Sequence, residues 1–227
     1  MSRVLVFGDI HLPFIREGYI EFVKEVYKKY KCSKVVFMGD LFDLHRTGSR
    51  HLPNPNAAGA KEEYDKALKI AKKIYKAFPV VKVCVGNHDA RYYNGIADKS
   101  YPTSMLKTYS EWTKSPKGWD WQMRHIVDGV IYQHGTVYGG EYPHVTATMK
   151  NLGRSTIVGH IHTAAGIHYM ASGDVLPFAA IFGCGMDSNS YAAQYAIEYN
   201  KKPIVACGVV IDGKQPIVVP MDLGGKR

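Results

Sequence analysis

Cysteine is scarce in this chain, and no two cysteines lie close together in the sequence. The four cysteines are scattered over 227 residues, and no two of them have C-x-x-C spacing. Cys84 lies within a run of valines, which is typical of a small buried hydrophobic residue rather than of a thiolate ligand. A disulfide framework is therefore not expected in a chain of this size.

Long apolar runs are missing as well. No stretch approaches the roughly 18 apolar residues that a membrane span needs, and the opening MSRVLVFGDIHL lacks the charged region and long apolar run of a secretory signal. We find neither an internal repeat nor a low-complexity segment. Hydrophobic residues make up 46% and charged residues 22%, an ordinary composition for a globular protein. We therefore expect one domain over residues 1–227, located in the cytoplasm and without a membrane partner.

Acidic residues are few relative to basic ones. Lys and Arg number 29 against 20 Asp and Glu, which gives a formal net charge of +9. A basic protein attracts polyanions, and nucleic acid is the first candidate, although an anionic small molecule would be attracted too. Lysines such as Lys66 and Lys73 oppose the apolar stripe of a predicted helix, where solvation alone explains them. The charge therefore leaves the anionic partner open.

Apolar strands alternate with amphipathic helices in the first part of the chain. Strands are expected over residues 3–7, 35–38 and 80–85, and helices over 18–31 and 61–77. This alternation predicts βαβ units and a largely parallel sheet. In such sheets ligands bind beyond the carboxyl ends of the strands.

The later part of the chain is predicted to consist mostly of strands joined by turns. A hairpin is expected around the turn Asp128-Gly129. Helices are expected over residues 141–152 and, in part, over 103–113. The predicted later strands span residues 121–127, 130–133, 156–158, 166–170, 176–182, 203–211 and 217–219.

Five short polar clusters follow predicted strand ends and share the same residue types. They contain carboxylate, amide and imidazole groups and no thiolate, and a glycine precedes four of them. Taken singly, each cluster is weak evidence, since D-x-H is more typical of a hydrogen-bonded turn and a lone His134 of a satisfied or exposed histidine, but five in order at strand ends indicate a metal centre. A donor set rich in imidazole suits manganese, iron or zinc better than calcium or magnesium alone. The clusters are Asp9-Ile10-His11, Asp40-Leu41-Phe42-Asp43, Asn87-His88-Asp89, His134-Gly135 and His160-Ile161-His162.

Together the clusters resemble the signature of the calcineurin-like metallophosphoesterase superfamily. That signature is D-x-H, G-D-x-x-D, G-N-H-[DE], H and G-H-x-H in this order, and the resemblance spans residues 4–162. It implies an α/β fold, a four-layer αββα sandwich of two packed mixed sheets flanked by helices, in which the later strands would supply much of the second sheet. It also implies two divalent metal ions, with manganese first and iron, zinc or magnesium as alternatives. A hydroxide shared by the two ions would attack the phosphorus of a phosphoester substrate. The compact length resembles small stand-alone phosphodiesterases and uncharacterised phosphoesterases of bacteria and phages.

The resemblance also implies the ligands of each ion. Three residues would hold the first ion, three others would hold the second, and one aspartate would bridge both. The first set is Asp9, His11 and His162, the second is Asn87, His134 and His160, and the bridge is Asp40.

Catalytic roles follow from the same resemblance. His88, next to a ligand, would protonate the leaving oxygen or steady the transition state. Asp43 and Asp89 would lie behind the ligands, and Asp89 would orient His88, as carboxylates near metal sites commonly orient imidazoles.

The substrate is less determined than the metal centre. Phosphoprotein phosphatases of the superfamily carry Gly after the first His and Asp-Arg-Gly after the second motif; here Leu12 and Leu44-His45-Arg46 stand instead, which disfavours that activity. Arg46, Arg50 and Arg91 are candidates to pair with phosphate oxygens. Aromatic and basic residues over 91–117 suit single-stranded nucleic acid, or simply a core and a solvated surface.

Three functions remain open on the sequence alone. The first is a phosphodiesterase or nuclease, and the second is a phosphomonoesterase acting on a small phosphorylated metabolite. The third, of another class, is a non-catalytic scaffold that binds metal. The oligomeric state is not predicted.

Overall fold

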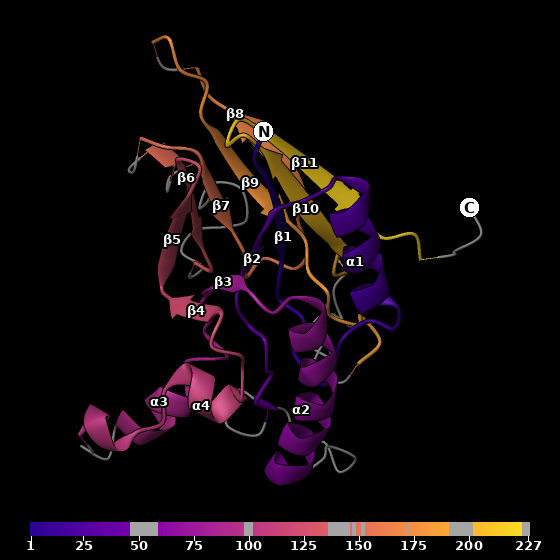
Figure 1. Cartoon of the computed structure of the whole chain (residues 1–227), viewed down its shortest axis with the longest axis vertical. Coiled ribbons are helices and arrows are strands. Elements are labelled where there is room, and N and C mark those ends of the chain that lie inside the picture. The colour runs from indigo at the N-terminus through magenta and orange to yellow at the C-terminus, as the bar shows by residue number, and fades with distance from the viewer. Residues whose placement is uncertain are drawn as a thin grey trace.

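The computed structural model describes residues 1–45, 59–97, 102–135, 146, 149–150, 153–171, 173–190 and 202–223. Two mixed sheets pack against each other and helices lie against them, which confirms the predicted α/β sandwich (Figure 1). Among the described residues, no helix is both long and apolar enough to span a membrane.

The first sheet has six strands in the order β11-β10-β1-β2-β3-β4. Strands β1 to β4 are parallel to one another, whereas β10 runs antiparallel to both of its neighbours, β1 and β11. The parallel part confirms the predicted βαβ units. The strands are β1 (Arg3–Phe7), β2 (Lys34–Phe37), β3 (Val81–Cys84), β4 (Trp119–Gln122), β10 (Ala206–Ile211) and β11 (Gln215–Pro220).

The second sheet has five strands in the order β5-β6-β7-β9-β8. Strands β6, β7 and β9 are parallel, and the edge strands β5 and β8 are antiparallel to their neighbours. The strands are β5 (Arg124–Val127), β6 (Val130–Gln133), β7 (Thr156–Val158), β8 (Ala165–Tyr169) and β9 (Phe178–Phe182).

Alternation along the strands divides the core into layers. In β1, Val4 and Val6 face the second sheet, while Leu5 and Phe7 face the helices, as the two-residue period of a strand requires. Between the sheets, Gly208 leaves room for the ring of Phe182, which a Cβ at this position would overlap. The two sheets therefore approach closely at this point.

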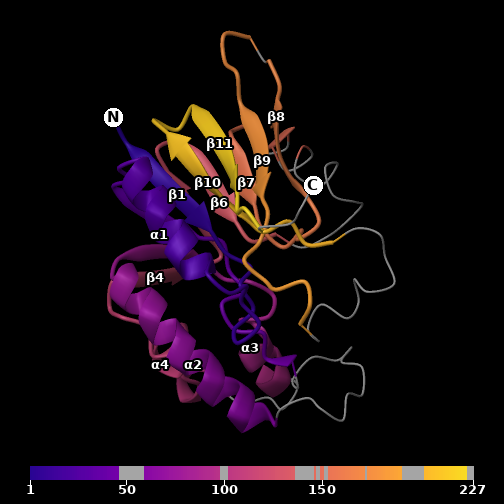
Figure 2. The same ribbon diagram turned by 90° about the vertical axis from the view of Figure 1, so that its right-hand side faces the viewer.

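Two long helices cover the outer face of the six-stranded sheet. They are α1 (Tyr19–Lys29) and α2 (Ala60–Ala77), which lie on one flank of the molecule in Figure 2. Val23 of α1 and Ala71 and Ile74 of α2 are buried in the cluster that contains Leu5 and Phe7. The lysines of α2 are exposed, as the solvation interpretation predicts.

Shorter helices follow β3. They are α3 (Arg91–Ala97), the 3-10 turn η2 (Thr103–Met105) and α4 (Tyr109–Thr113). Thr108 caps α4 by accepting the N–H of Glu111, whose carboxylate in turn accepts the N–H of Thr108. Partial helix was predicted over 103–113, and the structure has two short pieces of it.

The outer face of the five-stranded sheet carries its own apolar cluster. Helical Met149 is buried there against Val158, Ile161, Ala179 and Ile181. Most of the helix predicted over residues 141–152 lies outside the described residues.

One prediction about strands was wrong in detail. The strand predicted over residues 121–127 is two strands, because the chain leaves the first sheet after Gln122 and enters the second at Arg124. The later strands β5 to β9 form the second sheet, as predicted, whereas the last two, β10 and β11, belong to the first. The alternation of apolar residues predicts which face of a strand is buried, but not which sheet the strand joins.

Candidate metal centre

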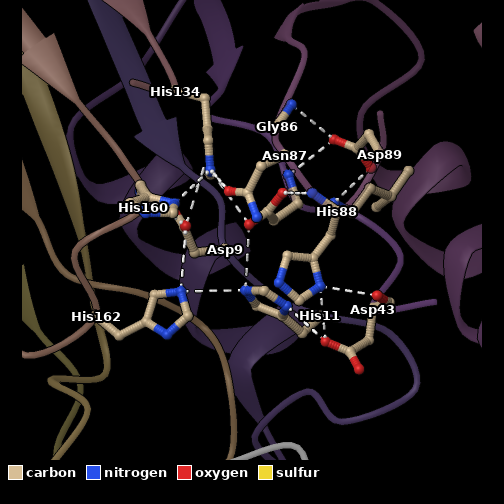
Figure 3. A network of polar contacts seen from close by, with 12 residues as sticks. Asp9, His11, Asp43, Gly86, Asn87, His88, Asp89, His134, His160 and His162 are labelled. Carbon is tan, nitrogen blue, oxygen red and sulfur yellow. Dashed lines mark hydrogen bonds and ion pairs between the residues drawn. The ribbon is translucent and has the colours of Figure 1, made fainter. Parts of the chain in front are cut away.

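Each polar cluster follows the carboxyl end of a strand. The clusters of Asp9, Asp40 and Asn87 follow β1, β2 and β3, and those of His134 and His160 follow β6 and β7. Because the strands within each set are parallel, their carboxyl ends meet at one edge of each sheet. Figure 3 shows these side chains, drawn from distant parts of the chain, turned toward one another.

Several of these residues adopt a left-handed backbone. The φ angles of Asp9, His11, Asp40 and His160 are 49°, 46°, 53° and 68°. This conformation is unfavourable by roughly 1–2 kcal/mol for a residue with a Cβ. Hydrogen bonds between clusters offset it: the Asp9 Oδ1 accepts the N–H of His160 at 2.9 Å, and the Asp40 Oδ1 accepts the N–H of His88 at 2.8 Å. Strained residues that converge in this way are typical of a functional site.

Gly86 makes room for the central aspartate. A Cβ at this position would overlap both the carboxylate and the backbone nitrogen of Asp40. Glycine is thus required here for close approach of the third cluster to the second.

One group of possible ligands comprises Asp9, His11, Asp40 and His162. One ligand atom of each lies within 4.8 Å of the others. The His162 Nε2 is 3.3 Å from the Asp9 Oδ1, and the His11 Nε2 is 3.6 Å from the Asp40 Oδ2. All except His162 are buried.

A second group comprises Asp40, His134 and His160, again within 4.8 Å of one another. The His134 Nε2 is 3.2 Å from the Asp40 Oδ2 and 3.2 Å from the His160 Nδ1. It is also 2.9 Å from the Asn87 Oδ1, which brings the predicted amide into this group. Asp40 belongs to both groups.

The donor atoms in these groups fit a bound cation. The Nδ1 of His134 lies 2.8 Å from the carbonyl oxygen of Met38, which can only accept, so the Nδ1 carries a proton, and in the neutral ring the lone pair of the Nε2 points inward. His11 is arranged in the same way, since its Nδ1 is 2.9 Å from the Asp43 Oδ1. Its inward Nε2 is 3.1 Å from the Nε2 of His162. Lone pairs and carboxylate oxygens facing one another require a positive charge between them.

Burial and charge at the centre support the same conclusion. The Oδ2 of Asp9 is buried and has no hydrogen-bond partner in the described part of the chain. Burial lowers the pKa of His134, but the carboxylates of Asp40 and Asp9 outweigh this effect and raise it to about 10. The field of the two aspartates thus strongly favours a cation, either a proton or a metal ion.

The ring of His88 lies beside the first group. Its Nδ1 is 2.8 Å from the carbonyl oxygen of Asp43 and 3.0 Å from the Asp43 Oδ1. Its Nε2 is 3.1 Å from an Nη of Arg91, whose other Nη donates to the Asp43 carbonyl at 2.7 Å. Burial lowers the pKa of His88, but the charges of Asp40 and Asp43 raise it above the usual value.

Asp89 makes different contacts from those predicted. Its carboxylate accepts the backbone N–H groups of Asp40 at 2.8 Å, Leu41 at 3.1 Å and Gly86 at 3.0 Å. Burial and the charge of Asp40 raise the pKa of Asp89 to about 7. The contact that orients the His88 ring comes from Asp43, so the predicted orientation of His88 by Asp89 was wrong. Asp89 instead joins the turns after β2 and β3.

The family assignment follows from a match to a family model. Residues 2–183 match the model of calcineurin-like phosphoesterases. The chain belongs to this family. The resemblance predicted from the five clusters is therefore confirmed. Among curated proteins, no sequence matches this chain.

Solved structures with this fold include three of different descriptions. This calcineurin-like phosphoesterase is similar to vacuolar protein sorting 29 from Cryptosporidium parvum, with a TM-score of 0.46, 13% identity and coverage of 95% of each chain. It is similar to YfcE, a phosphoesterase from E. coli, with a TM-score of 0.39, 13% identity, and coverage of 92% of this chain and 88% of that one. The Pseudomonas putida nuclease MPE gives a TM-score of 0.42, 11% identity, and coverage of 94% and 87%.

A cavity of about 230 Å³ opens directly over the ligand groups of this phosphoesterase. It gives a substrate access to both sets of histidines and to His88. Met186, which sequence reasoning missed, supplies an apolar wall. The lining residues are His11, Asp40, Asp43, His88, His160, His162 and Met186.

The predicted arginines divide into two cases. Arg91 lies beside His88 as described above, whereas Arg46 and Arg50 lie outside the described residues. The structure also places His45 near the centre, with its Nδ1 3.5 Å from the Asp43 Oδ2. In the sequence, the one sign of this contact is the position of His45, two residues after the second cluster.

Proposed function

We propose that this phosphoesterase hydrolyses phosphodiester bonds with two divalent metal ions, of which manganese is the first choice and iron, zinc or magnesium the alternatives. One observation carries the proposal: the two ligand groups share Asp40, whose Oδ2 faces His11 on one side and His134 on the other. Asp9, His11 and His162 would complete one site, and Asn87, His134 and His160 the other.

The charges of the ligands set what the site can bind. Two buried aspartates and four imidazoles leave the centre with a net charge that divalent cations would balance. Such a pair of ions supplies Lewis acidity and makes water acidic enough to react near neutral pH. The carbonyl of Met38 and the carboxylate of Asp43 hold His134 and His11 in the tautomer that a metal ligand needs.

His88 is the proposed proton donor to the leaving oxygen. Asp43 fixes the ring through the Nδ1 and raises its pKa, so the Nε2 side can carry a proton and lies at the cavity. In the structure, an Nη of Arg91 lies 3.1 Å from this Nε2. A phosphate oxygen is a stronger acceptor for a guanidinium than an imidazole is. We therefore assign Arg91 to the substrate phosphate, which frees the His88 Nε2 for the leaving group.

A panel of metals and substrates tests the proposal. Chelated protein is reloaded with Mn²⁺, Fe²⁺, Zn²⁺ or Mg²⁺ and assayed on bis(p-nitrophenyl) phosphate, p-nitrophenyl phosphate, a cyclic nucleotide, and single- and double-stranded DNA and RNA. We expect hydrolysis of the diesters to depend on metal and to exceed that of the monoester, with a steep loss at high salt for any polymer. Preference for the monoester would indicate the phosphomonoesterase. Metal-loaded protein inert on every ester would indicate the non-catalytic scaffold. A cytoplasmic location stays a prediction.

A further inference from the structure

A second cavity, of about 580 Å³, borders the metal centre. Asn87 lies in its wall, as does Gly135, which directly follows His134. The cavity therefore adjoins the second ligand group. The roles proposed for Arg91 and His88 do not depend on this group. The polar residues of the cavity lining are Asn87, Asn94, Arg124 and Gln133, and the exposed Met123 is one of its apolar residues.

Arg124 brings a positive charge to this cavity. It lies directly opposite Gln133 in the pairing of β5 with β6. The next residue, His125, points into the protein, where its Nε2 lies 3.0 Å from the carbonyl oxygen of Val83. Since side chains alternate along a strand, Arg124 points to the opposite, open side.

Among the described residues, the guanidinium of Arg124 has a hydrogen-bond partner at one of its three nitrogens. Its Nε donates to the Gln133 Oε1 at 3.0 Å. No carboxylate in the described part of the chain pairs with it, whereas Arg16 lies 3.5 Å from a carboxylate oxygen of Asp187. The two terminal nitrogens form the fork that binds oxyanions, and the contact with Gln133 fixes its orientation in advance.

The register places this arginine close to the centre. Gln133 immediately precedes His134, and paired residues on neighbouring strands lie about 5 Å apart, so the α-carbons of Arg124 and His134 are within about 10 Å. The side chains of Arg124 and His134 leave the backbone on opposite faces, but Asn87 of the second ligand group and Arg124 line the same cavity, so an anion at Arg124 would lie beside the metal centre.

We propose that this second cavity binds another phosphate group of the substrate, next to the scissile diester, and that Arg124 is the residue that recognises it. The substrate class is then an oligonucleotide, or a nucleotide diester with a flanking phosphate. The exposed Met123, at 71% relative exposure, offers an apolar surface for the intervening nucleoside, and Asn94 offers a hydrogen-bonding amide. This inference rests on the proposed diesterase function and narrows its substrate.

The experiment compares thymidine dinucleotides that differ only in a terminal phosphate. Binding of TpT, pTpT and TpTp is measured by calorimetry in EDTA, where no turnover occurs, and hydrolysis is measured with Mn²⁺. We expect the chain to prefer one of the phosphorylated forms. Arg124→Ala should lose that preference by roughly 10-fold, mainly in KM rather than kcat, and Arg124→Lys should recover part of it. Arg154→Ala removes the same charge near the amino end of β7 and should keep the full preference.

The outcomes separate this inference from the proposed function. No preference for either phosphate in the unmodified chain, or the same preference in Arg124→Ala and the unmodified chain, overturns the assignment of Arg124. Equal losses in Arg124→Ala and Arg154→Ala would also overturn it, because they would reflect net charge alone. If binding prefers a phosphorylated dinucleotide while no diester is hydrolysed with any metal, the cavity assignment holds and the diesterase proposal fails.

Discussion

At the scale of single residues, the site depends on a few contacts that give ordinary side chains special properties. Asp40 is the clearest case, because its Oδ2 faces histidines of both ligand groups while its Oδ1 accepts the N–H of His88. No other residue of the described chain appears in both the four-residue group and the group of Asp40, His134 and His160. Loss of its charge should therefore affect the whole centre.

Asp40→Asn is expected to reduce the bound metal more than any other single substitution of a ligand. The amide keeps the volume but removes the charge that both sites share. Metal analysis after dialysis and activity on a diester measure the effect, with a loss of activity of at least about 100-fold. Asp120→Asn, at an exposed pair with Lys82, is the matched control and should retain metal and activity.

His88→Ala separates chemistry from metal binding. His88 contacts Asp43 and Arg91 and forms a third possible ligand group with His11 and Asp43, but it belongs to neither of the two groups that share Asp40. We expect kcat to fall by roughly 10²–10⁴-fold while metal content stays unchanged, as for loss of a general acid. A large loss of metal from this variant would contradict the proposed role.

At the scale of elements, the turns that follow the strands position the site residues as much as the strands themselves do. The turns after β2 and β3 meet at Asp89, whose carboxylate accepts three backbone N–H groups from them. This carboxylate is fully buried, so no water can replace it at those donors. We therefore expect it to contribute to the shape of the turns more than to the reaction.

Asp89→Ala should lower stability first and activity second. Removing the carboxylate leaves buried N–H groups without an acceptor, each unfavourable by about 1–3 kcal/mol. Denaturant unfolding monitored by circular dichroism should report this loss. In Asp43→Ala, by contrast, we expect a smaller change of stability and a larger fall of kcat, because Asp43 contacts the ring of His88. The reverse order in the two variants would refute the distinction.

At the scale of the whole molecule, the centre forms where two sheets meet. β1, β2 and β3 supply clusters from one sheet and β6 and β7 from the other, so the relative position of the sheets sets the distances between ligands. The packing of Phe182 against Gly208 is one of the contacts that fixes this position.

Gly208→Ala tests the dependence of the site on sheet packing. The added Cβ would overlap the ring of Phe182, and overpacking of this kind typically destabilises by about 1–3 kcal/mol. Thermal unfolding should show a lower Tm, and metal affinity should fall with it. A second substitution, Phe182→Leu, makes space and should restore part of both. If Gly208→Ala changes neither property, the sheets tolerate a shift at this point.

The sequence by itself determined the family and the candidate residues of the metal site, because the motifs D-x-H, G-D-x-x-D, G-N-H-D and G-H-x-H are each defined by the spacing of residues that are close together in the chain. It also determined the two long helices α1 and α2 and most strands, whose periodicity is equally local, but not the short helix α3. Only the tertiary structure decided that the chain passes from one sheet to the other at Met123 and that β10 pairs with β1. It also decided that Asp43 rather than Asp89 orients His88, and that Arg124 faces a cavity beside Asn87. These are contacts between residues far apart in the chain, and neither spacing nor periodicity records them.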